Sequence, residues 1–114
     1  MFSQENRLRH EKDIKALFLK GKSAFGVLVS VKFYPNRLGV ARFAVVIGTK
    51  VAKRAVVRNR LRRQVREIIK KYLAEMKPGY DVALLIKKEA IGKKSRQIEE
   101  ELVATLKRKT PLLP

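Results

Sequence analysis

The segment of residues 53–71 constrains the fold most, because it has two opposite faces of different chemistry. Its apolar residues recur at steps of three and four: Val57, Leu61, Val65, Ile68 and Tyr72. That spacing predicts an amphipathic helix, which must bury its apolar side against the rest of the chain. The stripe on the other side carries Asn59, Arg63, Arg66 and Lys70.

The basic side of this helix is unusually uniform in charge. Lys and Arg occupy nine of its 19 positions, and Glu67 is its only acidic residue. Most charged helix faces are simply solvated, but such faces usually mix signs in pairs four residues apart. This face does not, so we interpret it as a surface for a polyanion.

The charge of the whole chain points the same way. The 114 residues carry 28 Lys and Arg against 10 Asp and Glu, a net charge of +18. So large an excess repels itself unless a polyanion screens it. Nucleic acid is therefore the expected partner, and a membrane surface is the weaker option because no basic helix has a broad Trp, Phe or Leu face.

Length and composition indicate one nucleic-acid-binding domain over residues 1–114, with residues 1–9 flexible apart from Leu8, and residues 110–114 as a tail. There is no cysteine, so disulfides and zinc knuckles are excluded. The beginning of the sequence lacks the apolar core of a signal peptide, and no apolar run has membrane-spanning length. We therefore expect a cytoplasmic protein.

The first half of the chain predicts one helix and two strands. A helix is expected over residues 11–19, with Gly21 as a left-handed stop. Alternating residues predict a strand over 26–34, with Val27, Val29, Val31 and Phe33 on one face and Leu28, Ser30, Lys32 and Tyr34 on the other. A second strand over 41–47 is expected to pair antiparallel with the first across residues 35–39.

The second half predicts a strand and a helix after the basic helix. Residues 80–87 form a nearly continuous apolar run, typical of an inner strand. After a loop over 88–94, Ser95 is the expected N-cap of a helix reaching Lys107, with a buried stripe of Ile98, Leu102 and Leu106. We interpret Glu99, Glu100 and Glu101 as surface charge, because adjacent helical positions diverge by about 100°.

These elements give an α+β fold, a small single-domain α/β sandwich of order α-β-β-(β)-α-β-α. The bracketed strand is a further short one that residues 36–41 have room for. The basic helix joins the last two main strands in a β-α-β unit.

Catalytic signatures are absent. His10 is the only histidine, which argues against histidine-based metal sites and Ser-His relays. The Gly-Lys-Ser at 21–23 lacks the upstream glycine of a phosphate loop. No pair of carboxylates is placed to converge, so we name no catalytic and no metal-binding residue.

One motif is specific. The run Val57-Arg58-Asn59-Arg60-Leu61-Arg62-Arg63-Gln64-Val65-Arg66-Glu67 resembles the signature of the bacterial ribonuclease P protein subunit. The preceding residues 48–55 and the N-terminal Arg7-Leu8-Arg9, Asp13, Phe18 and Gly21-Lys22-Ser23 are also similar to that family. The resemblance covers nearly the whole chain in the same order.

The resemblance implies a subunit of a ribonucleoprotein that removes the 5′ leader from precursor tRNA. Its partners would be the catalytic ribonuclease P RNA and precursor tRNA, with no obligate protein partner. Magnesium would be held mainly by the RNA, and none firmly by the protein. The family also implies a left-handed crossover around the basic helix, against the usual preference.

The resemblance also implies residue roles. Contacts to the catalytic RNA would come from Lys50, Lys53, Arg54, Arg58, Asn59, Arg60, Arg62, Arg63 and Arg66. A cleft for the single-stranded leader would be formed by Arg9, Ile14, Phe18, Lys32 and Tyr34. Ile14 and Lys32 stand where the family often has aromatic residues, so stacking would be reduced there.

Other interpretations remain open at this stage. Phe18 could simply fill the core, Asn59 could bond the backbone within the fold, and the stems of Arg58 and Arg60 could cover apolar surface. For the whole chain, the alternatives are a non-catalytic ribosomal or RNA-chaperone type RNA-binding protein and a self-sufficient nuclease. The nuclease is the weakest, because it would need converging carboxylates.

Overall fold

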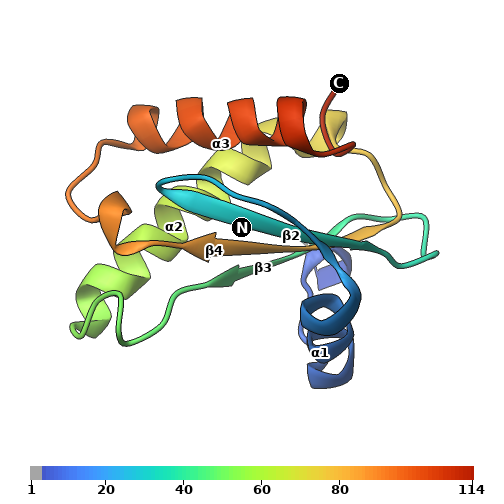
Figure 1. Cartoon of the computed structure of the whole chain (residues 1–114), viewed down its shortest axis with the longest axis horizontal. Coiled ribbons are helices and arrows are strands. Elements are labelled where there is room, and N and C mark those ends of the chain that lie inside the picture. Colours follow the sequence, from blue (N-terminus) through green and yellow to red (C-terminus); the bar gives the residue numbers. More distant parts are fainter. Residues whose placement is uncertain (1–3) are drawn as a thin grey trace.

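The computed structural model describes residues 4–114 (Figure 1). Residues 1–3, part of the segment expected to be flexible, lie outside the described residues. The helices and strands, in chain order, are α1 (Glu11–Lys20), β1 (Lys22–Ala24), β2 (Val29–Pro35), β3 (Arg42–Val46), α2 (Ala55–Tyr72), β4 (Tyr80–Ile86) and α3 (Ser95–Lys109). Three short 3-10 turns occupy Gln4–Asn6, Leu73–Glu75 and Lys88–Ala90.

The four strands form one sheet in the order β1-β2-β4-β3. The antiparallel pairing predicted between β2 and β3 is wrong, because β4 lies between them. β4 pairs antiparallel with β2 and parallel with β3. It takes the central place because its two apolar faces can both be covered. The parallel pair joined through α2 confirms the predicted β-α-β unit.

The sheet is covered by helices on both faces. On one face, α2 and α3 pack their apolar stripes against the large core cluster, which includes Val31, Val82 and Leu84. Ile98, Leu102 and Leu106 of α3 are buried as predicted. On the other face, Leu17 of α1 packs beside Leu8 and Ala83 in a smaller cluster. Figure 1 shows α3 along the top of the sheet and α1 below it.

Both ends of the described chain contribute to the core, Leu8 as expected and the C-terminal residues more than expected. Near the N-terminus, Leu8 is buried and donates its backbone N–H to the Phe43 carbonyl oxygen at 2.9 Å. Near the C-terminus, Leu112 and Leu113 are buried in the large cluster. The Leu112 carbonyl oxygen accepts the backbone N–H of Lys77 at 2.9 Å. Leu112 and Leu113 therefore anchor the C-terminal segment to the core, whereas Pro111 and Pro114 are exposed.

Several local predictions are corrected. Gly21 has a φ of −70°, so it is not a left-handed stop. Glycine is needed there because an added Cβ would lie 2.4 Å from the Leu17 carbonyl oxygen. Ser95 is the first helical residue rather than the N-cap, and the backbone N–H of Lys94 donates to Gln97 Oε1 at 3.0 Å. The additional short strand is β1, before β2, and not within 36–41.

Residues 26–28 do not continue β2, so the predicted alternation fails there. Val27 is 64% exposed, whereas Leu28 is buried in the large core cluster. The cause is Glu101 of α3, whose carboxylate accepts the backbone N–H groups of Val27, Leu28 and Val29. Our interpretation of Glu101 as plain surface charge was therefore wrong.

Candidate nucleic-acid interface

Helix α2 buries its apolar side and leaves its cationic side in solvent. Leu61, Val65, Ile68 and Ile69 are buried, so the opposite side faces away from the core. We call the outward cationic set, with the loop before the helix, the basic surface. It comprises Lys50, Lys53, Arg54, Asn59, Arg60, Arg63 and Arg66, which are exposed, and the half-buried Arg62. Within residues 4–114, none of these cations forms an ion pair.

Arg58 differs from the other predicted RNA-binding residues. It is half-buried, and its Nη1 donates to the carbonyl oxygens of Ala52 at 2.8 Å and Lys53 at 2.7 Å. These bonds close the loop that leads into α2. Arg58 therefore shapes the basic surface by holding the backbone that carries Lys53 and Arg54.

Asn59 does not bond the backbone in the way the local alternative supposed. Its side-chain oxygen accepts a hydrogen bond from Arg62 Nη1 at 3.1 Å. Asn59 also lines a groove of about 460 Å³ together with Val56, Val57, Arg60 and Arg63. Val56 is 71% exposed, so this groove offers apolar contact beside two arginines.

A cleft lies between α1 and the β3 edge of the sheet. It encloses about 700 Å³ and is lined by Arg7, Leu8, Arg9, Ile14, Phe43, Ala44, Val45, Val46 and Arg66. Arg66 belongs to both this cleft and the basic surface, so the two are continuous. Three arginines beside apolar side chains suit a single strand of nucleic acid, because the arginines can bind its phosphates while the apolar side chains contact its bases.

The predicted leader residues are divided between three places. Arg9 and Ile14 line the cleft. Phe18 is 37% exposed, and Lys32 Nζ lies 5.6 Å from its ring centroid while donating to its carbonyl oxygen at 2.8 Å. Phe18 is therefore not plain core filling. Tyr34 packs against the small cluster of Leu8, Leu17 and Ala83, and it also lines a different cavity.

Small side chains form the surface of the sheet between these residues, and we call Ala44 and Ala83 the alanine floor. Lys32 of β2 is in register with Ala83 of β4, which is in register with Ala44 of β3. Two alanines side by side leave space above the sheet beneath α1. Sequence reasoning did not select Ala44 or Ala83, since nothing in their own pattern marks them.

Arg42 fixes α1 above this floor. Its guanidinium binds Asp81 of β4 and lies 3.3 Å from an oxygen of Asp13 in α1. The hydrogen bond that Arg42 donates to Asp81 is the main reason that the pKa of Arg42 is raised, against the opposing effect of burial. Sequence reasoning missed Arg42, and it also omitted Arg7 from the cleft although Arg7 lies in the quoted N-terminal motif.

Metal-binding geometry is not found in the part of the chain that the structure describes. No group of three His, Cys, Asp or Glu side chains there could hold a metal ion. Among the same residues, no helix is long and apolar enough to cross a membrane.

Comparison with known proteins decides the family. A family model described as Ribonuclease P matches residues 2–110. The chain belongs to the ribonuclease P protein family. A ribonuclease P protein component of Microcystis aeruginosa is 39% identical over 92 residues, covering 77% of each chain. That of Syntrophomonas wolfei is 30% identical over 109 residues, covering 95% of this chain and 90% of the relative.

Solved structures agree with the ribonuclease P fold. The RNase P protein from Thermotoga maritima, solved with 1-(4-fluorophenyl)-2-thiourea, superposes with a TM-score of 0.81 at 30% identity. The match covers 90% of this chain and 98% of that one. A Staphylococcus aureus RNase P protein mutant gives a TM-score of 0.84 at 23% identity, covering 91% and 87% of the two chains, which supports the fold alone.

Proposed function

We propose that the protein is the protein subunit of ribonuclease P and assists removal of the 5′ leader from precursor tRNA. The observation that carries the proposal is the continuity, through Arg66, of the unpaired basic surface with the cleft beneath α1. A subunit that joins a catalytic RNA to its substrate needs both surfaces in contact with one another.

The basic surface would bind the catalytic RNA. Arg60 and Arg63 are exposed and can present planar guanidinium groups to phosphates in a two-point manner. The exposed Val56 beside them offers apolar contact to an unstacked base. Arg58 would act indirectly, by holding the loop that carries Lys53 and Arg54.

The cleft would take the single-stranded leader of precursor tRNA. Arg7, Arg9 and Arg66 would contact its phosphates, and Ile14 with the alanine floor would contact its bases. Phe18 and Lys32, which lie against each other beside α1, would extend this surface. Binding the leader and the catalytic RNA together would hold the scissile phosphate at the RNA's active site.

Magnesium would be held mainly by the RNA, where it would supply the electrostatic stabilisation of the cleaved phosphate. The described residues of the protein do not gather the ligands for a protein-held ion. Cationic side chains on α2 would instead reduce the magnesium needed, by screening the phosphates that approach one another.

Reconstitution tests this proposal. The pure protein is mixed with a bacterial ribonuclease P RNA and a precursor tRNA at low magnesium, and cleavage is compared with protein alone and RNA alone. We expect cleavage at the mature 5′ end only in the mixture. Arg60→Glu should reduce this cleavage strongly. Lys107→Glu makes the same charge change at an exposed position of α3 and should not reduce it.

The other outcomes would change the function assigned. A mixture that behaves like the RNA alone would favour a ribosomal or RNA-chaperone type RNA-binding protein. Cleavage by the protein alone would move the chemistry from the RNA to this chain.

A further inference from the structure

Another cavity lies where β4 begins, at the end of the sheet opposite to the start of α2. It encloses about 460 Å³, within the size range of small-ligand sites. Its walls come from the end of α1, β1, the end of β2, the start of β4, the end of α3 and the residues that follow it. Lining it are Lys20, Lys22, Phe33, Tyr34, Pro35, Tyr80, Arg108, Lys109, Thr110 and Pro111. It shares no residue with the cleft or with the basic surface.

The wall contributed by the C-terminal segment is fixed. Thr110 Oγ1 donates to the Leu106 carbonyl oxygen at 2.6 Å and accepts the backbone N–H of Leu112 at 3.1 Å. Leu112 is fully buried beneath it. The cavity is therefore a formed feature of the fold rather than a gap beside a loose end.

The lining combines aromatic rings with cations and contains no carboxylate. Tyr34 and Tyr80 are half-buried, and Tyr80 packs edge-on against Phe33 with ring centroids 6.1 Å apart. Lys77 adds a cation 5.9 Å from the centroid of the Tyr80 ring. Among residues 4–114, no acidic side chain forms an ion pair with Lys20, Lys22 or Arg108.

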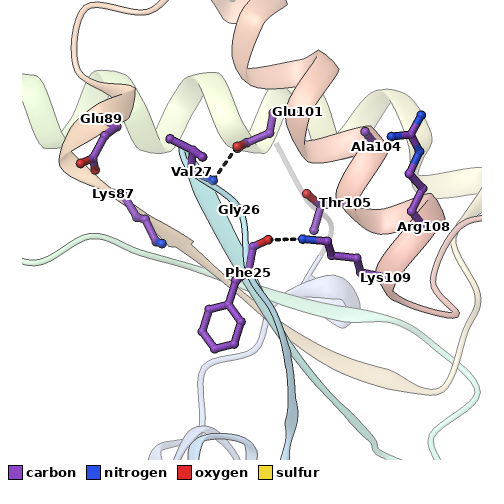
Figure 2. Close-up of a pocket in the computed structure, with 10 residues that line it drawn as sticks. All are labelled: Phe25, Gly26, Val27, Lys87, Glu89, Glu101, Ala104, Thr105, Arg108 and Lys109. Atoms are coloured by element: carbon purple, nitrogen blue, oxygen red, sulfur yellow. Dashed lines mark hydrogen bonds between the residues drawn. The ribbon is translucent and has the colours of Figure 1, made fainter.

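The neighbouring cavity in Figure 2 is a useful contrast. It also borders Arg108 and Lys109, but Glu89 and Glu101 line it. Figure 2 shows Glu101 bonded to Val27 and Lys109 bonded to the Phe25 carbonyl oxygen, at 2.9 Å for the latter. Glu101 and Lys109 hold the β1–β2 connection to α3, so two charged groups of that cavity are already used within the fold.

We propose that the carboxylate-free cavity binds a nucleotide of single-stranded RNA. A base would stack on Tyr80, and the flanking phosphates would be bound by Lys20, Lys22 and Arg108. Proteins bind single strands without dependence on sequence by stacking the bases on aromatic rings and binding the phosphates with cationic side chains. The cavity shares no lining residue with the cleft, so its test uses neither the catalytic RNA nor precursor tRNA.

The test is an NMR titration of the full, isotope-labelled chain with the trinucleotide pUpUpU. We expect saturable amide shifts at Lys22, Tyr80 and Thr110, distinct from any shifts along α2. Lys22→Glu and Arg108→Glu should each weaken this local Kd by about fivefold or more, the range for one lost base or phosphate contact. Lys107→Glu, an equal charge change beside Arg108 but outside the cavity, should change it less than about twofold.

Three results would overturn the proposal. The first is shifts confined to α2 and the cleft beneath α1. The second is equal weakening by Lys107→Glu and Arg108→Glu, which would indicate general charge attraction. The third is equal binding of a tri-aspartate peptide at the same amides, which would assign the cavity to an acidic protein partner.

Discussion

Arg42 and Asp81 form a two-point ion pair, with Nε 2.7 Å from Oδ1 and Nη2 2.7 Å from Oδ2. The side chains are only 13% and 7% exposed. Asn36 Nδ2 also donates to Asp81 Oδ1 at 2.9 Å. The pair joins β3 to β4, and through Asp13 it joins both strands to α1. The position of α1, and so the shape of the cleft, depends on it.

Removing Asp81 should therefore destabilise the fold strongly. We expect Asp81→Ala to lower the free energy of unfolding by about 3 kcal/mol, because it leaves the buried Arg42 charge with only the 3.3 Å contact to Asp13. Urea unfolding would measure the change. The exposed pair of Lys15 and Glu11 is the control, since Lys15→Ala should cost less than about 0.5 kcal/mol. A loss below about 1 kcal/mol for Asp81→Ala would contradict this role.

Glu101 should stabilise the connection between β1 and β2. Glu101→Ala removes the acceptor for the backbone N–H groups of residues 27–29. We expect a loss of about 1.5–3 kcal/mol in unfolding free energy, as for hydrogen bonds to a charged group. Hydrogen exchange should speed up at those three amides. Glu100→Ala removes the adjacent exposed carboxylate and should leave their exchange unchanged.

Glu99 should make stability depend on pH in the acid range. Hydrogen bonds from Lys71 and Tyr72 lower the pKa of Glu99 from its usual 4.5. A lowered pKa in the folded state gives stability that is present above the unfolded value and is lost as pH falls through the folded value. Urea unfolding from about pH 6 to pH 3 should show a smaller decrease for Glu99→Gln than for the wild type. Glu100→Gln should follow the wild type, and parallel curves for all three would exclude the effect.

The parts of the fold that sequence predicted are those fixed by local periodicity. Leu61, Val65 and Ile68 of α2, and Ile98 and Leu102 of α3, are buried because a helix repeats every 3.6 residues wherever it packs. The apolar run of β4 likewise indicated an inner strand. Which strands pair depends instead on contacts distant in sequence, and so the order β1-β2-β4-β3 was not predicted.

The candidate site shows the same division. The outward position of Arg60 and Arg63 follows from the helix alone. The cleft was predicted only through the family resemblance. Tyr34 packs against the same small cluster as Ile14 and Ala44, on the face that the alternation of β2 predicted, although it does not line the cleft itself. The structural role of Arg58 depends on carbonyl groups in a preceding loop, whose course no periodicity gives.

Arg58 and Arg60 should therefore respond differently to removal, although they are two residues apart. Arg60→Ala should lower affinity for the catalytic RNA and reduce the slope of log K against log salt by about 1, the effect of one phosphate contact. Its unfolding free energy should stay within about 0.5 kcal/mol of the wild type.

Arg58→Ala should lower stability by about 1–3 kcal/mol, since two carbonyl groups lose their charged donor. Binding isotherms over a salt series, together with urea unfolding, separate the two variants. If Arg60→Ala destabilised the fold while RNA affinity and its salt slope were unchanged, Arg60 would be a structural residue.

Arg66 should contribute to leader binding beyond its charge, because it alone of the α2 residues lines the cleft. The measurement compares the affinity of the reconstituted ribonucleoprotein for precursor tRNA with its affinity for the same tRNA without a leader. Arg66→Gln should reduce this ratio by about tenfold, which corresponds to about 1.4 kcal/mol for one charge-assisted contact.

Arg63→Gln is the matched control, because Arg63 is exposed on the same helix but lines the groove instead of the cleft. It should weaken assembly with the catalytic RNA and leave the leader ratio unchanged. Equal ratios for both variants would mean that α2 contributes only general attraction, and that the leader lies elsewhere on the protein.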